Sequence, residues 1–284
     1  MIKRFSELVK LSHTIFALPF ALIGYTYGIT STAANFEWVT LAQVLLCMVF
    51  ARNTAMGFNR WADRDIDGAN PRTANREIPA GIISARSALI FVIINALLFI
   101  GVACTINSLT AILSPIALAV VLFYSYCKRF TAAAHLVLGL GLSIAPVGAY
   151  IAMTGEFAIA PCILAIVVLT WCSGFDIIYA LQDREFDREN GLHSIPSRFS
   201  VRGALGISIG LHIISAIALF WFVLMLSAAP WIWVGVAIFT ALLVAQHLVV
   251  TPTKVRNIGI AFGTLNGIAS CILAIFTILS LIFA

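Results

Sequence analysis

The chain has 284 residues, of which 61% are hydrophobic and only 10% are charged. A soluble domain is about 45–50% apolar and about 25% charged, so this composition excludes that class and indicates a protein that folds largely in lipid. The net charge of +5 could suggest nucleic acid as a partner. The basic residues form no stripe or tail, however, and their placement indicates membrane topology, so we expect membrane lipid and no nucleic acid as partners.

Uncharged stretches predict nine membrane-spanning helices, because about 20 apolar residues are needed to cross the core of a bilayer. In chain order, we expect the spans within residues 11–36, 37–59, 87–127 (two helices with a turn at 106–109), 130–155, 157–175, 203–253 (two helices divided near 227–231) and 257–284. The predicted fold class is therefore all-α, a polytopic membrane helix bundle that forms a single domain over residues 1–284.

The basic residues support this count. All 17 Lys and Arg residues precede the first span, end the second, or lie in the connections after spans 2, 4, 6 and 8. In a nine-helix protein these positions share one side of the membrane, and an excess of Lys and Arg marks the cytoplasmic side. We therefore expect a cytoplasmic N-terminus and an integral protein of the cytoplasmic (inner) membrane.

Two short acidic segments stand out from the hydrophobic chain. ADRDIDG at 62–68 follows the second predicted span, and QDREFDR at 182–188 follows the sixth. Both carry Asp-Arg-acid-x-Asp on the side predicted to be cytoplasmic. The repetition predicts two halves of the protein that face one site, which opens to the cytoplasm.

Helical spacing places the acids of each segment on one face. Asn59, Asp63 and Asp67 are four residues apart, so each step around an α-helix drifts by only about 40°. The second set is spaced seven and four residues apart and shares its stripe with Tyr179: Asp176, Asp183 and Asp187. Asp65 points elsewhere, and we expect it to pair with a neighbouring Arg.

Carboxylates gathered on one face repel one another, and a divalent cation removes that conflict. Oxygen ligands without His or Cys favour Mg²⁺ or Mn²⁺. Proteins usually hold Mg²⁺ with one or two carboxylates together with substrate phosphates. The planar fork of Arg matches phosphate oxygens. We therefore expect a phosphate group near Arg72, Arg76 and Lys128.

Three motifs resemble those of a known family. Asn59-x3-Asp63-x3-Asp67 resembles the first aspartate motif of the UbiA-type intramembrane aromatic prenyltransferases, and Asp176-x2-Tyr179-x3-Asp183-x3-Asp187 resembles the second. Tyr124-x3-Lys128 is similar to the Tyr-x3-Lys motif between helices 4 and 5 of that family. The helix count also matches, so the resemblance covers essentially the whole chain. The stretch SHTIFALPFAL, from residue 12, resembles the 4-hydroxybenzoate polyprenyltransferase-like branch.

The resemblance implies transfer of a polyprenyl group from its diphosphate to an aromatic acid, and it implies a role for each site residue. Mg²⁺ would be held by Asp63, Asp67, Asp183 and Asp187. The diphosphate would be bound by Asn59, Arg72, Arg76 and Lys128. An allylic cation would be stabilised through cation–π contact by Tyr124 and Tyr179. Asp176 would accept or orient the hydroxyl proton of the acceptor.

Three alternatives stay open at this point. The same chemistry could use 1,4-dihydroxy-6-naphthoate for menaquinone, or haem, as the acceptor. A transporter with the acidic stripes as an ion path would explain Asp176 but not the Arg-rich connections.

The histidines show no paired spacing and are expected to serve in packing, with His13 as the exception: His13, His135, His193, His212 and His247.

Overall fold

The computed structural model describes residues 16–253 and 257–284, and every element of regular structure in those ranges is a helix. The long helices are α2 (Leu18–Thr32), α3 (Trp38–Ala62), α5 (Ala85–Cys104), α6 (Ser108–Cys127), α7 (Ala134–Thr154), α8 (Ile159–Ala180), α11 (Val201–Leu224), α12 (Ile232–Val249) and α13 (Asn266–Ile282). The short elements are α4 (Arg64–Ala69), η2 (Leu181–Asp183), α9 (Arg184–Glu189), α10 (Ile195–Arg198) and the π-helical turn η3 (Ile260–Leu265). The predicted all-α class is confirmed, while His13 lies outside the described residues.

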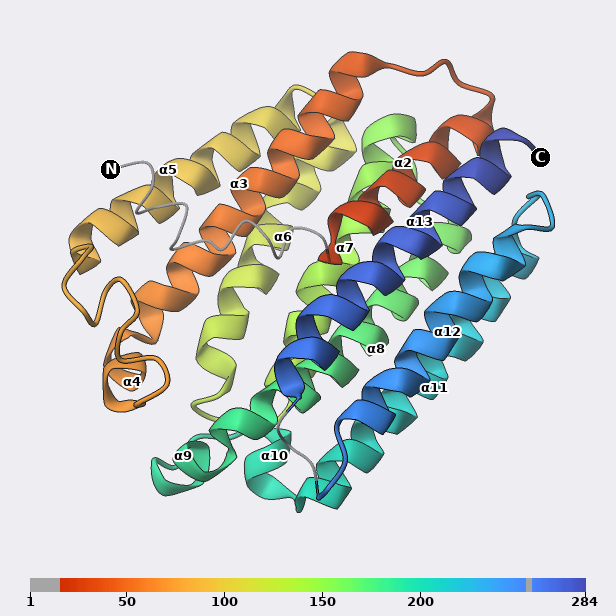
Figure 1. Cartoon of the computed structure of the whole chain (residues 1–284). Helices are drawn as coiled ribbons and strands as arrows, with labels where there is room; N and C mark the ends of the chain where they lie inside the picture. The colour runs from red at the N-terminus through yellow and green to blue at the C-terminus, as the bar shows by residue number, and fades with distance from the viewer. Residues whose placement is uncertain (1–15, 254–256) are drawn as a thin grey trace.

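Eight helices of the described part are long and apolar enough to cross a membrane. They are α3, α5, α6, α7, α8 with its continuation to Glu189, α11, α12, and α13 with the preceding π-helical turn. α2 has 15 residues, which at 1.5 Å per residue span about 22 Å, less than the bilayer core of about 30 Å. It runs beside α7 and α13 (Figure 1). The count of nine spans therefore stays a prediction.

The turns inside the long apolar runs lie where they were predicted. α5 ends at Cys104, and Asn107 begins α6 by accepting a hydrogen bond from the backbone N–H of Thr110 at 2.8 Å. Such a side chain satisfies an N–H group that has no partner within its own helix. The other run divides between Leu224 and Ile232. Both breaks follow from local polar or Pro-containing sequence.

α8 is the central helix of the bundle, in contact with α7 on one side and α11 on another. Its Trp171 is fully buried among aromatic rings, including those of Phe20 and Phe175. α7 approaches α8 closely at Gly139, where an added Cβ would lie 2.3 Å from the backbone oxygen of Leu169. The glycine therefore permits direct hydrogen bonds between these two helices.

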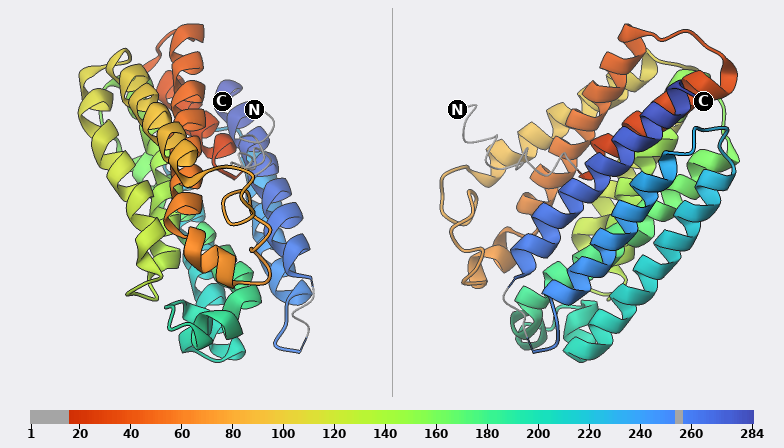
Figure 2. Two further views of the ribbon diagram at one scale, coloured as in Figure 1. Left: turned by 90° about the vertical axis from the view of Figure 1, so that its left-hand side faces the viewer. Right: turned by 45° about the vertical axis from the view of Figure 1, so that its right-hand side comes forward.

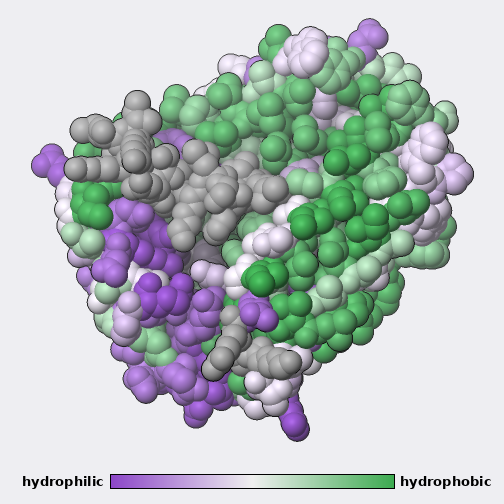
Figure 3. Space-filling view, in the orientation of Figure 1, coloured by the Kyte–Doolittle hydropathy of each residue, from purple (hydrophilic) through white to green (hydrophobic). Residues whose placement is uncertain are grey.

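One end of the bundle is hydrophilic. α4, α9 and α10 lie at this end, and both views of Figure 2 keep them there. Figure 3 shows hydrophilic surface gathered near α4, whereas the flank of the long helices is hydrophobic. Among the described basic residues, all but Arg52 lie in or beside the connections at this end, from α3 to α5, α6 to α7 and α8 to α11.

Both acidic segments interrupt a helix at their first Asp. α3 ends at Ala62, and Asp63 leaves helical geometry with φ −94° and ψ 9° before α4 begins. Asp183 does the same with φ −102° and ψ 5° before α9 begins. Asp favours helix ends over helix interiors because its side chain competes for backbone groups. The helical path on which each acidic set was predicted to share one face is therefore bent at its first Asp, although the backbone of Asp67 still donates to the carbonyl of Asp63 at 2.7 Å.

Candidate active site

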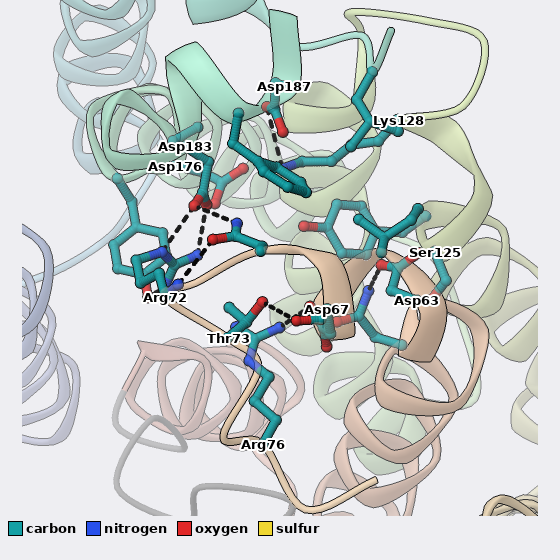
Figure 4. A pocket seen from close by; sticks show the side chains of 18 residues that line it. Asp63, Asp67, Arg72, Thr73, Arg76, Ser125, Lys128, Asp176, Asp183 and Asp187 are labelled. Atoms are coloured by element: carbon teal, nitrogen blue, oxygen red, sulfur yellow. Dashed lines mark hydrogen bonds and ion pairs between the residues drawn. The ribbon is translucent and has the colours of Figure 1, made fainter. Parts of the chain in front are cut away.

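A pocket of about 120 Å³ lies at the hydrophilic end, between the two acidic segments (Figure 4). It is lined from α3, α4, the connection to α5, α6, α8 and α9. The structure brings every predicted site residue to its wall: Asn59, Asp63, Asp67, Arg72, Arg76, Tyr124, Lys128, Asp176, Tyr179, Asp183 and Asp187. Asp65 lies outside this lining and pairs with Arg64 at 3.7 Å, as expected.

The carboxylates of the first segment each contact a guanidinium. Arg76 Nη1 lies 2.6 Å from Asp67 Oδ1. Arg129 Nη2 lies 2.9 Å from Asp63 Oδ1, and the Asn59 side chain donates to Asp63 Oδ2 at 2.9 Å. The first acidic segment is therefore neutralised by its own connection and by the end of α6.

The carboxylates of the second segment are matched in the same way. Arg72 donates to both oxygens of Asp183, which also accepts from the Asn70 amide at 3.0 Å. Lys128 Nζ lies 3.5 Å from Asp187 Oδ2. Because Arg72 and Asn70 follow the first segment in sequence, these contacts join the two halves across the pocket.

The last Asp of each segment keeps one buried oxygen without a hydrogen bond: Oδ2 of Asp67 and Oδ2 of Asp187. Each lies only at the longer distance of an ion pair, Asp67 Oδ2 3.9 Å from Arg60 Nη1 and Asp187 Oδ2 3.5 Å from Lys128 Nζ. Because a buried carboxylate oxygen normally has a hydrogen-bond partner, these two atoms suit a hard cation, which prefers oxygen ligands. Within the described ranges, no three His, Cys, Asp or Glu side chains form a ready metal cage. The residues therefore fit Mg²⁺ held jointly with a phosphate ligand, the expected arrangement for this ion.

Asp63 has an unusual acidity for a carboxyl at a helix end. Burial raises its pKa to about 6, and the positive charge of Arg129 opposes part of this rise. As the pH rises, a carboxyl in this environment loses its proton only slightly below neutral pH. The charge of Asp63 can therefore change at a pH only slightly below neutral.

The inner part of the pocket is lined by α6 and α8. Asp176 lies seven residues before Asp183 and is 9% exposed. Tyr124 on α6 lines the same part. Tyr179 lies one turn further along α8 than Asp176, and the guanidinium of Arg72 lies 5.6 Å from the centre of its ring.

The polar residues of the site that were not predicted include Arg129, Asn70 and His135. Arg129 directly follows Lys128, a predicted site residue, so its position next to Lys128 could have indicated that it lies at the site. Asn70 follows Asp67 by three residues in a connection without regular spacing. His135 was expected only to pack, yet its Nδ1 lies 2.6 Å from Oδ2 of Asp176. A lone histidine in an apolar run offers no pattern that would predict this contact.

Residues 17–268 match the UbiA prenyltransferase family. The chain belongs to this family. Its membership confirms the resemblance drawn from the three motifs, and it argues against the transporter alternative. It also agrees with the placement of the acidic segments, since both lie inside the matched range.

Curated relatives of this UbiA family member include 4-hydroxybenzoate octaprenyltransferases. The protein of that name from Aliivibrio fischeri (strain MJ11) is 34% identical over 158 residues, which are 56% of this chain and 55% of that protein. The one from Idiomarina loihiensis is 32% identical over 204 residues, 72% of this chain and 71% of that protein. The chain thus spans from about half to about 70% of the length of these relatives.

Solved structures share the fold of this family member. The apo structure of a UbiA homolog from Aeropyrum pernix K1 has a TM-score of 0.84 at 29% identity, covering 93% of this chain and 96% of that one. A UbiA homolog from Archaeoglobus fulgidus bound to DMAPP and Mg²⁺ has a TM-score of 0.75 at 22% identity, covering 98% of this chain and 99% of that one. The bundle described above is therefore the UbiA fold.

Proposed function

We propose that this UbiA family member transfers a polyprenyl group from its diphosphate to an aromatic acid of the 4-hydroxybenzoate type, in a Mg²⁺-dependent step of quinone biosynthesis. One observation carries the proposal: four carboxylates from two acidic segments surround one pocket, each beside its own basic side chain. The names of the curated relatives support the acceptor class. The homolog bound to DMAPP and Mg²⁺ is consistent with the donor class.

The rim of the pocket would bind the diphosphate. Asp63, Asp67, Asp183 and Asp187 would hold Mg²⁺, which when bound supplies positive charge against the charge that develops on the leaving diphosphate. Arg72, Arg76 and Lys128 would contact the diphosphate oxygens directly, and the amide of Asn59 would add a neutral donor. Preorganised charge of this kind stabilises the transition state without reorganisation during the reaction.

The inner wall would receive the two reacting carbons. As the C–O bond of the donor breaks, its electron pair leaves with the diphosphate and an allylic cation remains. The ring faces of Tyr124 and Tyr179 would stabilise that cation. A ring carbon beside the acceptor's hydroxyl then supplies the electron pair for the new C–C bond, and the proton on that carbon is lost. Asp176 would bind the hydroxyl group.

The site would open to the cytoplasm. The basic residues of the described connections gather at the end that carries the pocket. Because Lys and Arg accumulate on the cytoplasmic side of membrane proteins, we place this end in the cytoplasm, with the N-terminus on the same side and the protein in the inner membrane.

Purified protein with a polyprenyl diphosphate and 4-hydroxybenzoate tests the proposal, with the prenylated product measured by mass spectrometry. Asp63→Ala and Asp183→Ala should abolish product formation. Asp65→Ala is the matched control, because this side chain is 87% exposed and lies outside the pocket lining. Wild-type rates in excess chelator, or in either pocket variant, would refute the proposal. The same assay with 1,4-dihydroxy-6-naphthoate tests the alternative acceptor.

A further inference from the structure

A buried imidazole contacts the deepest carboxylate of the pocket. His135, in the first turn of α7, is 1% exposed, and its Nδ1 lies 2.6 Å from Oδ2 of Asp176. Asp176 lies about 10 Å along α8 from Asp183, given seven residues at 1.5 Å each. Both Asp176 and Asp183 line the pocket (Figure 4). His135 is not part of the pocket lining, so it acts on the site through Asp176.

The backbone N–H of Ile195 fixes the proton on this imidazole. It points at Nε2 over 3.3 Å, and since a backbone N–H can only donate, Nε2 must accept. A neutral imidazole with an accepting Nε2 carries its proton on Nδ1, which therefore donates to Oδ2 of Asp176. Oδ2 is thereby committed to His135, and Asp176 meets a ligand in the pocket through Oδ1.

Contacts on both sides hold the imidazole in this orientation. The Ser173 hydroxyl donates to the backbone oxygen of His135 at 3.0 Å, which ties the start of α7 to α8. Gly139, one turn further along α7, allows the two helices to approach. Ile195 is fixed in turn because Ser194 and Ser197 form a reciprocal cap at the start of α10. The His135–Asp176 pair is therefore preorganised by three helices.

We propose that His135 is a positioning residue that aims Oδ1 of Asp176 at the hydroxyl group of the aromatic acceptor. The proposal rests on the proposed function. As the ring carbon forms its bond to the allylic cation, the hydroxyl proton passes to Oδ1 of Asp176, and the ring becomes a neutral dienone. The proton on the substituted carbon then leaves to water, and Asp176 returns its proton to the ring oxygen, which restores the phenol. The hydrogen bond from Nδ1 to Oδ2 is compatible with both states of Asp176.

The test compares two acceptors that differ in the acidity of the hydroxyl: 4-hydroxybenzoate and 3-fluoro-4-hydroxybenzoate, which keeps one free carbon beside the hydroxyl. His135→Phe retains a ring but removes the donor. It should lower kcat/KM for 4-hydroxybenzoate at least about tenfold, since general-base help contributes about 10²–10⁴-fold. The loss for the fluorinated acceptor should be several-fold smaller, because its more acidic hydroxyl needs less help. His135→Leu should show the same contrast.

Recovery of activity in a His135 variant that restores the hydrogen-bond donor distinguishes a positioning role from a packing role. His135→Asn places an amide N–H near the position of Nδ1, so it should recover most of the lost rate with 4-hydroxybenzoate. His247→Leu is the matched control: this imidazole is hydrogen-bonded to His212 at 2.9 Å between α12 and α11. Loss of this imidazole should leave the ratio of kcat/KM for the two acceptors unchanged. Mg²⁺-dependent binding of an unreactive thiolodiphosphate analogue of the donor should be the same in wild type and His135→Phe.

Equal losses for both acceptors in the Phe and Leu variants, together with no recovery in His135→Asn, would show a merely structural role and overturn the assignment. A failure of the wild-type protein to prenylate any phenol would instead overturn the proposed function. The two failures are distinguishable, because the first is measured against an active wild type.

Discussion

The guanidinium of Arg72 binds both oxygens of the Asp183 carboxylate, with Nη2 2.5 Å from Oδ2 and Nε 2.8 Å from Oδ1. The two residues are 111 positions apart and belong to different halves of the chain. Three further carboxylates of the pocket each pair with a basic side chain through a single contact: Asp63 with Arg129, Asp67 with Arg76, and Asp187 with Lys128. Three of these four bases, Arg72, Arg76 and Lys128, are proposed to bind diphosphate, so these bases and the carboxylates proposed to hold Mg²⁺ neutralise one another.

This pairing predicts that Mg²⁺ and diphosphate bind cooperatively. Mg²⁺ alone must draw carboxylates away from their bases, and pyrophosphate alone must draw the bases away from the carboxylates. Either event leaves partly buried charges without partners, which is costly. When both ligands bind, each supplies the partner that the other removed. In thermal unfolding, the rise in Tm with both ligands should therefore exceed the sum of the separate rises. If the two separate rises in Tm simply add, the ion pairs of the pocket need not break when either ligand binds alone.

A second prediction separates donor binding from acceptor choice. Arg72 is proposed to bind the diphosphate and not the acceptor, so Arg72→Ala should slow transfer by a similar factor for every acceptor. A lost charge-assisted contact is worth roughly 1.5–3 kcal/mol, or roughly tenfold to a hundredfold in rate. Arg72→Lys should recover only part, since an ammonium lacks the planar fork. If the ratio of kcat/KM for 4-hydroxybenzoate and 1,4-dihydroxy-6-naphthoate changed more than a few-fold, Arg72 would belong to the acceptor site.

A third prediction concerns pH. Burial raises the pKa of Asp63 to about 6, so protons compete with Mg²⁺ for this carboxylate below that pH. The Mg²⁺ affinity measured in the presence of pyrophosphate should fall by up to about tenfold per pH unit below about 6 from this group, because the ligand must be ionised. Asp63→Asn should bind Mg²⁺ more weakly at pH 7.5 and lose most of this pH dependence. An unchanged pH dependence in Asp63→Asn would place the titrating group elsewhere.

The same pKa has a consequence for the stability of the metal-free protein. The folded state holds the Asp63 proton more tightly than the unfolded chain, whose carboxyl titrates near 3.8. The free energy of unfolding should therefore decrease as pH rises from about 4 to about 6. Asp63→Asn should flatten this part of the profile. Chelator-treated protein, unfolded at several pH values, provides the measurement, and a profile of the opposite slope would contradict the shift.

Part of this architecture follows from sequence alone. The lengths of the apolar stretches, and the polar or Pro-containing residues within them, predicted the turn at Asn107 and the division before Ile232. Polar or Pro-containing stretches have few other places in a chain that folds in lipid. The acids of each segment could be assigned to one site because spacing and membrane side restrict where they point. Asp67 and Asp187 show this best, since each occupies the same place in its segment.

Other features depend on how the helices pack, which spacing does not encode. The pairing of Arg72 with Asp183 requires the connection after α4 to meet η2 at one end of the bundle. The contact of His135 with Asp176 depends on the close approach at Gly139, a residue that looks ordinary in an apolar run. The helix interruption at Asp63 was missed because the i, i+4 spacing is also satisfied when the helix merely bends.

Topology gives a further prediction. Cysteines placed at Glu37, Glu156 and Glu189 in a variant without the native cysteines should differ in their access to an impermeant thiol reagent. Glu37 and Glu156 lie at the end opposite the pocket, whereas Glu189 ends α9 beside it. In intact cells the first two should react from outside and the third should not, because basic connections mark the cytoplasmic side. All three positions are exposed, so burial cannot explain a difference. Labelling at Glu189 would reverse the orientation.

The last prediction concerns the contact between α7 and α8. At Gly139 an added Cβ would lie 2.3 Å from the backbone oxygen of Leu169 and 2.4 Å from Oγ of Ser173. Because the backbone cannot yield without moving a helix, Gly139→Ala should destabilise the protein by about 1–3 kcal/mol, the usual effect of overpacking. Gly210→Ala, on α11, is the control, since nothing lies within 4 Å of its added Cβ. It should leave stability unchanged or raise it by up to about 1 kcal/mol.

Gly139→Ala should also affect chemistry, because moving α7 away from α8 lengthens the hydrogen bond between His135 and Asp176. Thermal unfolding in detergent gives the stability, and kcat/KM with 4-hydroxybenzoate gives the effect on transfer. At a temperature where both variants remain folded, Gly139→Ala should be slower than Gly210→Ala. The deficit should shrink with 3-fluoro-4-hydroxybenzoate, which depends less on Asp176. Full activity in a stably folded Gly139→Ala protein would show that the spacing of these helices does not control the pair.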